Sequence, residues 1–208
     1  MKKIRMVALL FGLALMLCAF GVANAAVVTF DDLSGTGPIP SGYAGLNWSD
    51  YFWYLNGDKY NGVIYGIAGY QNAVVSHSNV AFNAYQYPVV VSDSLFTFNS
   101  AYFTAAWNDG LNIEITGKKS GNTLYDATIE VDTSGPTLFS PNWTGIDELD
   151  FSSWGGINNP DYSGAGTNFA MDNFTYTANA VPEPATMLLL GSGLIGLAGY
   201  GRKKFFKK

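Results

Sequence analysis

Three aspartates near the two ends of the central region of the chain are the first candidates for chemistry. Asp31 and Asp32 follow an apolar stretch, and Asp172 lies in the last such stretch. On strand parity Asp32 shares a face with Phe30 and Asp172 with Phe174, and an unpartnered carboxylate beside apolar surface is costly. If the first and last strands run side by side, the three carboxylates can converge on a hard cation such as Ca²⁺. The alternative is that they accept backbone N–H bonds in turns.

Aromatic residues form a second candidate site. Five rings lie within seven residues, namely Trp48, Tyr51, Phe52, Trp53 and Tyr54. Trp and Tyr faces can stack on the C–H groups of sugars while Asn and Asp bind hydroxyls. Alternation along a strand sends about half of such rings into the core. We therefore expect Trp53, with Tyr51 and Tyr54, to form an exposed carbohydrate platform and Trp48 to be buried.

Groups for catalysis are few. His77 is the only histidine in the chain, which excludes multi-histidine metal sites, and no nucleophile elbow accompanies it. Asp147, Glu148 and Asp150 alternate with apolar residues and could supply a glycosidase carboxylate pair. Clustered acids in so acidic a region need no such explanation. We expect no catalytic residues, no enzymatic activity and no cofactor other than a structural Ca²⁺.

Residues 26–180, which we call the body, are acidic and aromatic. The body holds 3 lysines against 15 aspartates and glutamates, a formal charge of −12, which excludes nucleic acid as a partner. All 5 tryptophans lie in it, with many Gly and Asn residues, and long amphipathic helical patterns are absent. This profile is typical of an all-β extracellular domain.

Period-two alternation predicts the strands. Leu111, Ile113 and Ile115 share one face, and a polar turn at 118–122 leads to a second alternating run over 125–131, which together predict a β-hairpin. Further strands are expected at 26–33, 73–82, 88–91, 95–107, 146–151 and 168–176, with loops at 39–70 and 154–166. About eight strands in one domain of this length predict a single β-sandwich.

The N-terminal segment predicts export. A basic start and an apolar stretch over 7–22 precede Ala23-Asn24-Ala25, which fits the small-x-small rule for signal cleavage. Residues 1–25 are therefore a predicted signal peptide, handled by the Sec translocon and signal peptidase, and the mature chain would begin at Ala26. Because the only cysteine, Cys18, lies in this segment, the mature chain would contain no cysteine and must be held together by its core.

The C-terminal segment has three parts. A helix-breaking Val181-Pro182-Glu183-Pro184 ends a linker over 178–184. The 16 uncharged residues from Ala185 to Tyr200 would cover roughly 24 Å as a helix, against a hydrocarbon layer of roughly 30 Å. We therefore predict a transmembrane helix over 185–201 and a cytoplasmic tail over 202–208, held there by Arg202, Lys203, Lys204, Lys207 and Lys208.

This segment resembles the PEP-CTERM sorting signal of Gram-negative bacteria, and the resemblance implies an exosortase, a membrane transpeptidase, as processing partner. An ordinary single-pass anchor is the alternative. Thr29–Leu33, Ile39–Trp48 and Ala170–Tyr176 resemble the ends of jelly-roll domains that precede such tails. The resemblance implies an all-β, jelly-roll-like β-sandwich over residues 26–177.

Together these features predict an exported, non-enzymatic surface or matrix protein. It would be anchored in the inner membrane before processing, then reach the cell surface or extracellular matrix and associate with exopolysaccharide or biofilm. One alternative is a dedicated carbohydrate-binding module. Another is a secreted hydrolase such as a glycoside hydrolase, which would need a carboxylate pair in a groove.

Overall fold

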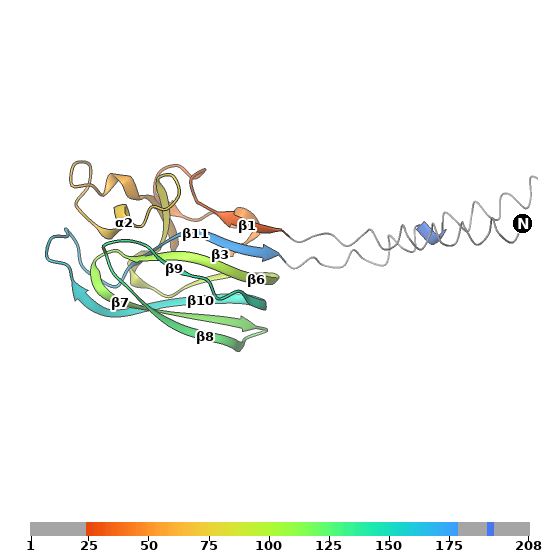
Figure 1. Ribbon diagram of the computed structural model, residues 1–208. Coiled ribbons are helices and arrows are strands. Elements are labelled where there is room, and N and C mark those ends of the chain that lie inside the picture. Colours follow the sequence, from red (N-terminus) through yellow and green to blue (C-terminus); the bar gives the residue numbers. More distant parts are fainter. Residues whose placement is uncertain (1–23, 179–190, 194–208) are drawn as a thin grey trace, which may run out of the picture. The chain divides into compact units, whose positions relative to one another are not determined.

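Strands account for most of the body, as the alternating patterns predict (Figure 1). The computed structural model describes residues 24–178 and 191–193. The strands among them are β1 (Ala25–Val28), β2 (Gly37–Pro38), β3 (Asn47–Trp48), β4 (Phe52–Asn56), β5 (Asn79–Asn83), β6 (Val89–Ala105), β7 (Asn108–Lys119), β8 (Asn122–Val131), β9 (Thr137–Phe139), β10 (Trp143–Asn158) and β11 (Phe169–Ala178). The connections hold the helix α2 (Gly69–Asn72) and the 3₁₀ turns η1 (Tyr43–Gly45), η2 (Gly57–Lys59) and η3 (Ala84–Gln86).

The strands are hydrogen-bonded in the order β2-β4-β5-β11-β6-β10-β7-β8, and every pairing is antiparallel. β1 is added to β11, whereas β3 and β9 are added to β6. β1 and β11 pair from Ala25 opposite Thr177 to Val28 opposite Phe174. The first and last strands therefore run side by side, which was the condition for the calcium hypothesis.

Ring contacts show that this sheet folds over on itself. Phe52 of β4 and Phe151 of β10 are four places apart in the strand order, which is roughly 19 Å in a flat sheet. Their ring centroids are only 5.9 Å apart. β6 joins the two layers, because it pairs with β10 between Val89 and Phe98 and with β11 between Phe96 and Ala105. The predicted all-β sandwich is confirmed.

Two apolar clusters bury the two faces of the layer that contains β4, β5 and β11. The main core lies between the layers and includes Phe52 and Met171. A second cluster, which includes Leu55, Tyr70 and Ala170, lies on the opposite face of these strands. Figure 1 shows α2, the element that carries Tyr70, beside this layer. Since both faces of this layer are covered, β4 and β11 carry apolar side chains on both of their faces.

The predicted hairpin is confirmed as β7 and β8, and several predicted boundaries are wrong. The strands expected at 88–91 and 95–107 are parts of one strand, β6, which begins at Val89 and ends at Ala105. The expected loop over 39–70 contains β4, and β10 extends to Asn158 in the expected loop over 154–166. Of the expected strand over 73–82, only residues from Asn79 onward are extended as a strand.

Backbone irregularities overturn both parity arguments for the aspartates. Asn173 has a φ of 50°, and the β11–β6 register shifts between Asp172 and Thr175. This bulge turns Asp172 away from the face of Phe174, which lies in the main core. Asp32 is not in a strand at all, because β1 ends at Val28 and a turn follows.

The predicted signal peptide, linker, membrane helix and basic tail lie outside the described residues, except at residues 24, 25, 178 and 191–193. Residues 191–193 are helical. In the part of the chain that the structure describes, no helix has the length and apolar character needed to cross a membrane.

Candidate functional site

Four aromatic side chains gather where the start of β4 meets the loop after β5. The ring centroid of Tyr51 is 4.6 Å from that of Tyr87 and 6.2 Å from that of Tyr85. Tyr85 is also 6.4 Å from Tyr87 and 5.7 Å from Trp53. We call Tyr51, Trp53, Tyr85 and Tyr87 the aromatic patch.

The patch is open to solvent. Tyr51, Tyr85 and Tyr87 are 44%, 66% and 50% exposed, and Trp53 is half-buried. The indole N–H of Trp53 is already used, since it donates to the carbonyl oxygen of Asp50 at 2.9 Å. The patch therefore offers ring faces and edges, with the tyrosine hydroxyls as polar groups.

Trp53 connects the patch to the second apolar cluster. Its ring lies 6.5 Å from that of Phe82, which lies 5.5 Å from that of Tyr70. Tyr70 in turn packs edge-on against Trp107 at 5.6 Å. Burial raises the pKa of the Tyr70 hydroxyl well above its ordinary value. The exposed rings thus continue into a packed row of aromatic side chains that fixes their base.

The loop that carries two of the rings has a strained backbone. Tyr85 and Gln86 have φ angles of 57° and 65°, in the left-handed region. This region costs a residue with a side chain roughly 1–2 kcal/mol. Two such residues in succession persist only where the surroundings hold them, and such residues are frequent at ligand-binding sites.

Asn83 holds this loop from below. It is fully buried, and its side-chain oxygen accepts the N–H of Phe169 at 2.8 Å. Its amide nitrogen donates to Ser153 Oγ at 3.2 Å, and its backbone carbonyl accepts Asn168 Nδ2 at 2.6 Å. Asn83 thereby ties the end of β5 to β10 and to the start of β11.

Two further bonds fix the rim of the loop. The side-chain oxygen of Gln86 accepts the N–H of Thr167 at 3.1 Å. The N–H of Ala84 donates to the carbonyl oxygen of Tyr51 at 2.9 Å, which joins the two halves of the patch. The patch is therefore built on a scaffold that is hydrogen-bonded on several sides.

The structure brings together two of the three residues predicted for carbohydrate contact. Tyr51 and Trp53 lie in the patch, but Tyr54 packs against the main core, and its hydroxyl donates to the carbonyl oxygen of Ser34 at 2.9 Å. Trp48 is buried, as predicted, with 7% of its surface exposed.

Tyr85 and Tyr87 were missed by sequence reasoning. They lie more than 30 positions beyond Tyr51, and only the β4–β5 register, with Phe52 opposite Asn83, brings them to it. A Tyr-x-Tyr pair between two predicted strands was the available signal. This pair can be placed beside Tyr51 only when the pairing of β4 with β5 is known.

Asp172 is buried and fully occupied by hydrogen bonds. One carboxylate oxygen accepts the N–H groups of Val75 and Ser76, each at 2.8 Å. The other accepts the N–H of Asn173 at 2.6 Å and the Ser76 hydroxyl at 3.0 Å. Burial raises the pKa of the Asp172 carboxyl above its ordinary value of 3.8, although these bonds act in the opposite direction. The carboxylate fastens the loop before β5 to β11.

The other two predicted metal ligands also accept hydrogen bonds. Asp31 accepts the N–H of Asn79 at 3.0 Å, and Asp32 accepts the hydroxyl of Tyr43 at 2.5 Å. Burial, followed by that bond to Asp32, raises the pKa of Tyr43 well above its ordinary value. Within residues 24–178 and 191–193, no three His, Cys, Asp or Glu side chains form a group that could hold a metal ion. Asp31 and Asp172 accept backbone N–H groups, as in the alternative that the sequence left open, whereas Asp32 accepts a side-chain hydroxyl.

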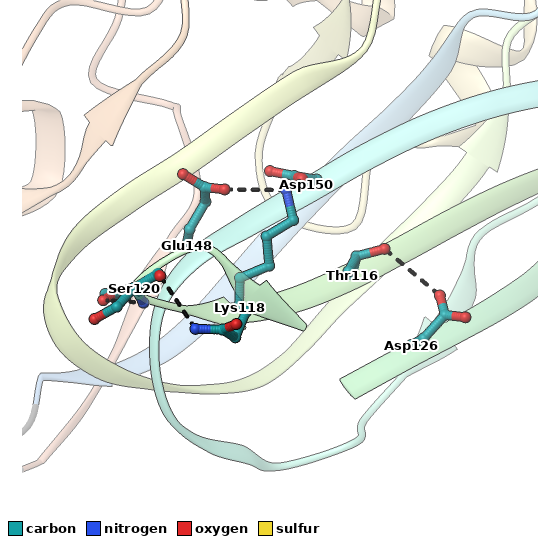
Figure 2. Close-up of polar contacts among 8 residues, drawn as sticks. Thr116, Lys118, Ser120, Asp126, Glu148 and Asp150 are labelled. Atoms are coloured by element: carbon teal, nitrogen blue, oxygen red, sulfur yellow. Dashed lines mark hydrogen bonds and ion pairs between the residues drawn. The ribbon is translucent and has the colours of Figure 1, made fainter. Parts of the chain in front are cut away.

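The acidic side chains of β10 are engaged by Lys118 (Figure 2). Lys118 Nζ is 3.1 Å from Glu148 and also pairs with Asp150. The hydrogen bond that Lys118 donates to Asp150 is the main cause of a Lys118 pKa above its ordinary value of 10.5. Asp147 accepts the N–H of Ser120 through both oxygens, at 3.0 and 2.9 Å. A glycosidase needs one carboxyl group as acid and another as base or nucleophile, whereas these groups neutralise a lysine and cap a turn.

A further carboxylate, Asp109 at the start of β7, joins three segments. It accepts the N–H and hydroxyl of Thr133 at 3.0 and 2.5 Å, and the amide of Asn159 at 3.0 Å. The bonds from Thr133 are the main cause of an Asp109 pKa below its ordinary value of 3.8. These bonds tie Thr133 and Asn159 to the start of β7 and use both oxygens of the Asp109 carboxylate.

The C-terminal residues match a known sorting signal. Residues 180–203 match the PEP-CTERM protein-sorting motif, so the chain carries the signal of an exported protein sorted by an exosortase. The match includes Val181, Pro182, Glu183 and Pro184. No curated protein matches the chain.

Solved structures share the β-sandwich. A DUF4465 family protein from Bacteroides caccae has a TM-score of 0.54 at 13% identity, covering 75% of this chain and 100% of that one. The CBM22-1–CBM22-2 tandem domain of Xyn10C from Paenibacillus barcinonensis has a TM-score of 0.40 at 12% identity, covering 80% and 48%. A second DUF4465 family protein, from Bacteroides ovatus, has a TM-score of 0.43 at 8% identity, covering 76% and 100%. The first of these likenesses establishes the fold of the body.

Proposed function

We propose that this chain is a non-enzymatic surface or matrix protein, exported and sorted by an exosortase, which binds extracellular polysaccharide through the aromatic patch. One observation carries the proposal: three exposed tyrosines and Trp53 form a connected set of ring contacts, in which Tyr51 and Trp53 come from the start of β4 and Tyr85 from a loop with left-handed backbone angles. Isolated exposed aromatic residues are common on proteins, but a mutually packed and hydrogen-bonded set is not needed by the fold.

The chemistry of the patch suits a sugar polymer. Tyrosine supplies a large, rigid ring with few rotatable bonds, so contacts made with it cost little conformational entropy. The ring faces can stack on sugar C–H groups, and the hydroxyls can exchange hydrogen bonds with those of the sugar. Because the loop is already fixed, binding requires little further ordering.

The place of the patch in the body supports the same role. Asn83 bonds to Phe169, the first residue of β11, so the patch lies near that end of the strand. Ala178 ends the strand nine residues later, roughly 30 Å away at about 3.3 Å per residue. The sorting motif begins at residue 180. The patch thus lies at the end of β11 opposite the point where the chain continues into the motif.

The absence of enzymatic activity is part of the proposal and rests on the carboxylates. The acids that could have formed a hydrolytic pair, Glu148 and Asp150, are ion-paired with Lys118. Asp147, the third acid of that group, accepts the N–H of Ser120 through both of its oxygens. Neither arrangement leaves a carboxyl group in a position to protonate a leaving group.

Retention on the exopolysaccharide of the producing bacterium tests the proposal. An aromatic contact contributes about 0.5–1.5 kcal/mol, so Tyr85→Ala should weaken binding about 2- to 13-fold and leave the melting temperature nearly unchanged. Tyr65→Ala is the control, because Tyr65 is likewise an exposed tyrosine, at 50% against 66% for Tyr85, but its ring contacts Tyr60 and not the patch. Wild-type protein that is not retained, or equal losses in the two variants, would refute the proposal.

A further inference from the structure

The body contains few cationic side chains. The chain has two arginines, Arg5 and Arg202, and both lie outside the body. The body contains three lysines, Lys59, Lys118 and Lys119, and one histidine, His77. Proteins recognise carboxylate, sulfate and phosphate groups mainly with arginine and lysine. The body therefore has few groups with which to hold a polyanion.

None of the three lysines lies at the aromatic patch. Ser153, which bonds to Asn83 below the patch, is opposite Ile113 of β7, and Lys118 is five residues further along, roughly 17 Å away. Lys118 is also occupied by two carboxylates, and Lys119 follows it. Lys59 is separated from Tyr51 by the whole of β4, which spans roughly 17 Å.

The charged residue that does adjoin the patch is an acid. Asp50 precedes Tyr51 in the turn closed by the bond from the Phe52 N–H to the carbonyl oxygen of Ser49, at 2.9 Å. Its carbonyl oxygen accepts the indole N–H of Trp53. Its side chain is exposed and accepts no hydrogen bond from the described residues. A negative charge thus stands at the rim of the patch, uncompensated by a nearby cation.

From this arrangement we infer the class of polymer that the patch accepts. The inference rests on the proposed function: the bound polysaccharide is uncharged or carries amino groups, and Asp50 is the residue that discriminates against polymers of uronate, sulfate or phosphate. A polyanion would bring like charges to Asp50 and to a body with a formal charge of −12. A sugar hydroxyl or ammonium group would instead find in Asp50 a hydrogen-bond acceptor.

The test uses the exopolysaccharide of the producing bacterium, separated on an anion-exchange column into an unretained and a retained, acidic fraction. Each fraction is immobilised on beads, and the processed protein recovered from the medium is titrated onto them in low salt. We expect binding to the unretained fraction that Tyr85→Ala weakens, and binding to the acidic fraction at least about tenfold weaker. Asp50→Lys should raise affinity for the acidic fraction about tenfold, and salt should cancel the gain.

The control is Asp161→Lys, which makes the same change of charge at another exposed aspartate. Wild-type protein that binds the acidic fraction as tightly as the unretained fraction, in a manner that Tyr85→Ala weakens, would overturn the inference while leaving the proposed function intact. An equal gain of affinity in Asp161→Lys would overturn the role of Asp50. Retention on neither fraction would refute the proposed function and this inference with it.

Discussion

Asp172→Asn offers the sharpest test of how the body is held together. The substitution keeps the shape of the side chain but replaces one acceptor oxygen by an NH₂ group. In the wild-type protein one oxygen accepts two backbone N–H groups, and the other accepts the N–H of Asn173 and the hydroxyl of Ser76. The least harmful amide orientation keeps its oxygen on the two N–H groups. The NH₂ group then faces the N–H of Asn173, while the Ser76 hydroxyl can rotate to accept.

The expected cost follows from this count. One buried N–H left without an acceptor costs about 1–3 kcal/mol, and the surviving bonds lose the strengthening that an ionised acceptor gives. Loss of the buried charge relieves its desolvation, which is the effect that raises the pKa of Asp172. We expect a net loss of about 2–3 kcal/mol in the free energy of unfolding. At about 2–4 °C per kcal/mol for a domain of this size, the melting temperature should fall by about 4–12 °C.

Thermal and urea unfolding of the variant measure this loss. Asp161→Asn is the control for charge, because Asp161 is exposed and its carboxylate takes no part in a described hydrogen bond. Equal stabilities of the two variants would refute the role given to Asp172. The same melts in EDTA and in millimolar calcium test the predicted cation: a wild-type melting temperature that rises with calcium, with no such rise in Asp172→Asn, would support the calcium hypothesis, and an unchanged wild-type melting temperature would refute it.

Three further substitutions test other parts of the structure. Trp48→Ala removes a buried ring that packs edge-on against three others at 5.2–5.7 Å, and should lower the free energy of unfolding by about 3–5 kcal/mol in urea titrations. The pKa of Asp109 is lower in the folded state, so the carboxylate stabilises the fold above pH 3.8 and this stabilisation is lost as the pH falls through the folded pKa. The difference in free energy of unfolding between wild type and Asp109→Asn should therefore shrink in acid, as urea titrations at several pH values would show. Gly166→Ala would place a Cβ 2.7 Å from Gln86 at a φ of 130°, and should cost about 1–3 kcal/mol in thermal melts and weaken polysaccharide retention. Gly135→Ala, where a Cβ meets nothing within 4 Å, should do neither.

The hairpin of β7 and β8 shows what sequence periodicity can predict. Leu111, Ile113 and Ile115 are buried on one face, and Ser120 and Gly121 turn the chain with positive φ angles. Alternation is visible there because one face is apolar and the other polar. Periodicity does not reveal β4, because the layer that contains it is buried on both faces. Phe52 and Leu55 belong to different clusters, so no apolar–polar alternation remains along the strand.

Single-residue bulges and non-local pairing set the other limits. The left-handed Asn173 reverses the facing of Asp172 relative to Phe174. Asparagine adopts this conformation more readily than most residues, but its presence alone does not distinguish a bulge from a regular strand position. The patch depends on which strand lies beside β4. Tyr51 and Trp53 could be proposed from crowding alone, but Tyr85 joins them only through the pairing of β4 with β5.

The strain in the patch loop is itself an argument for a role outside the fold. Two consecutive left-handed residues, Tyr85 and Gln86, cost roughly 2–4 kcal/mol. The three bonds of Asn83 and the bond of Gln86 to Thr167, at about 0.5–1.5 kcal/mol each, offset a comparable amount. A loop that only joined β5 to β6 could place glycine at position 85 and avoid much of this cost. A tyrosine at position 85 lowers the stability of the fold but holds an exposed ring against Tyr51 before any ligand binds. A ring fixed in advance is what a preorganised binding surface requires.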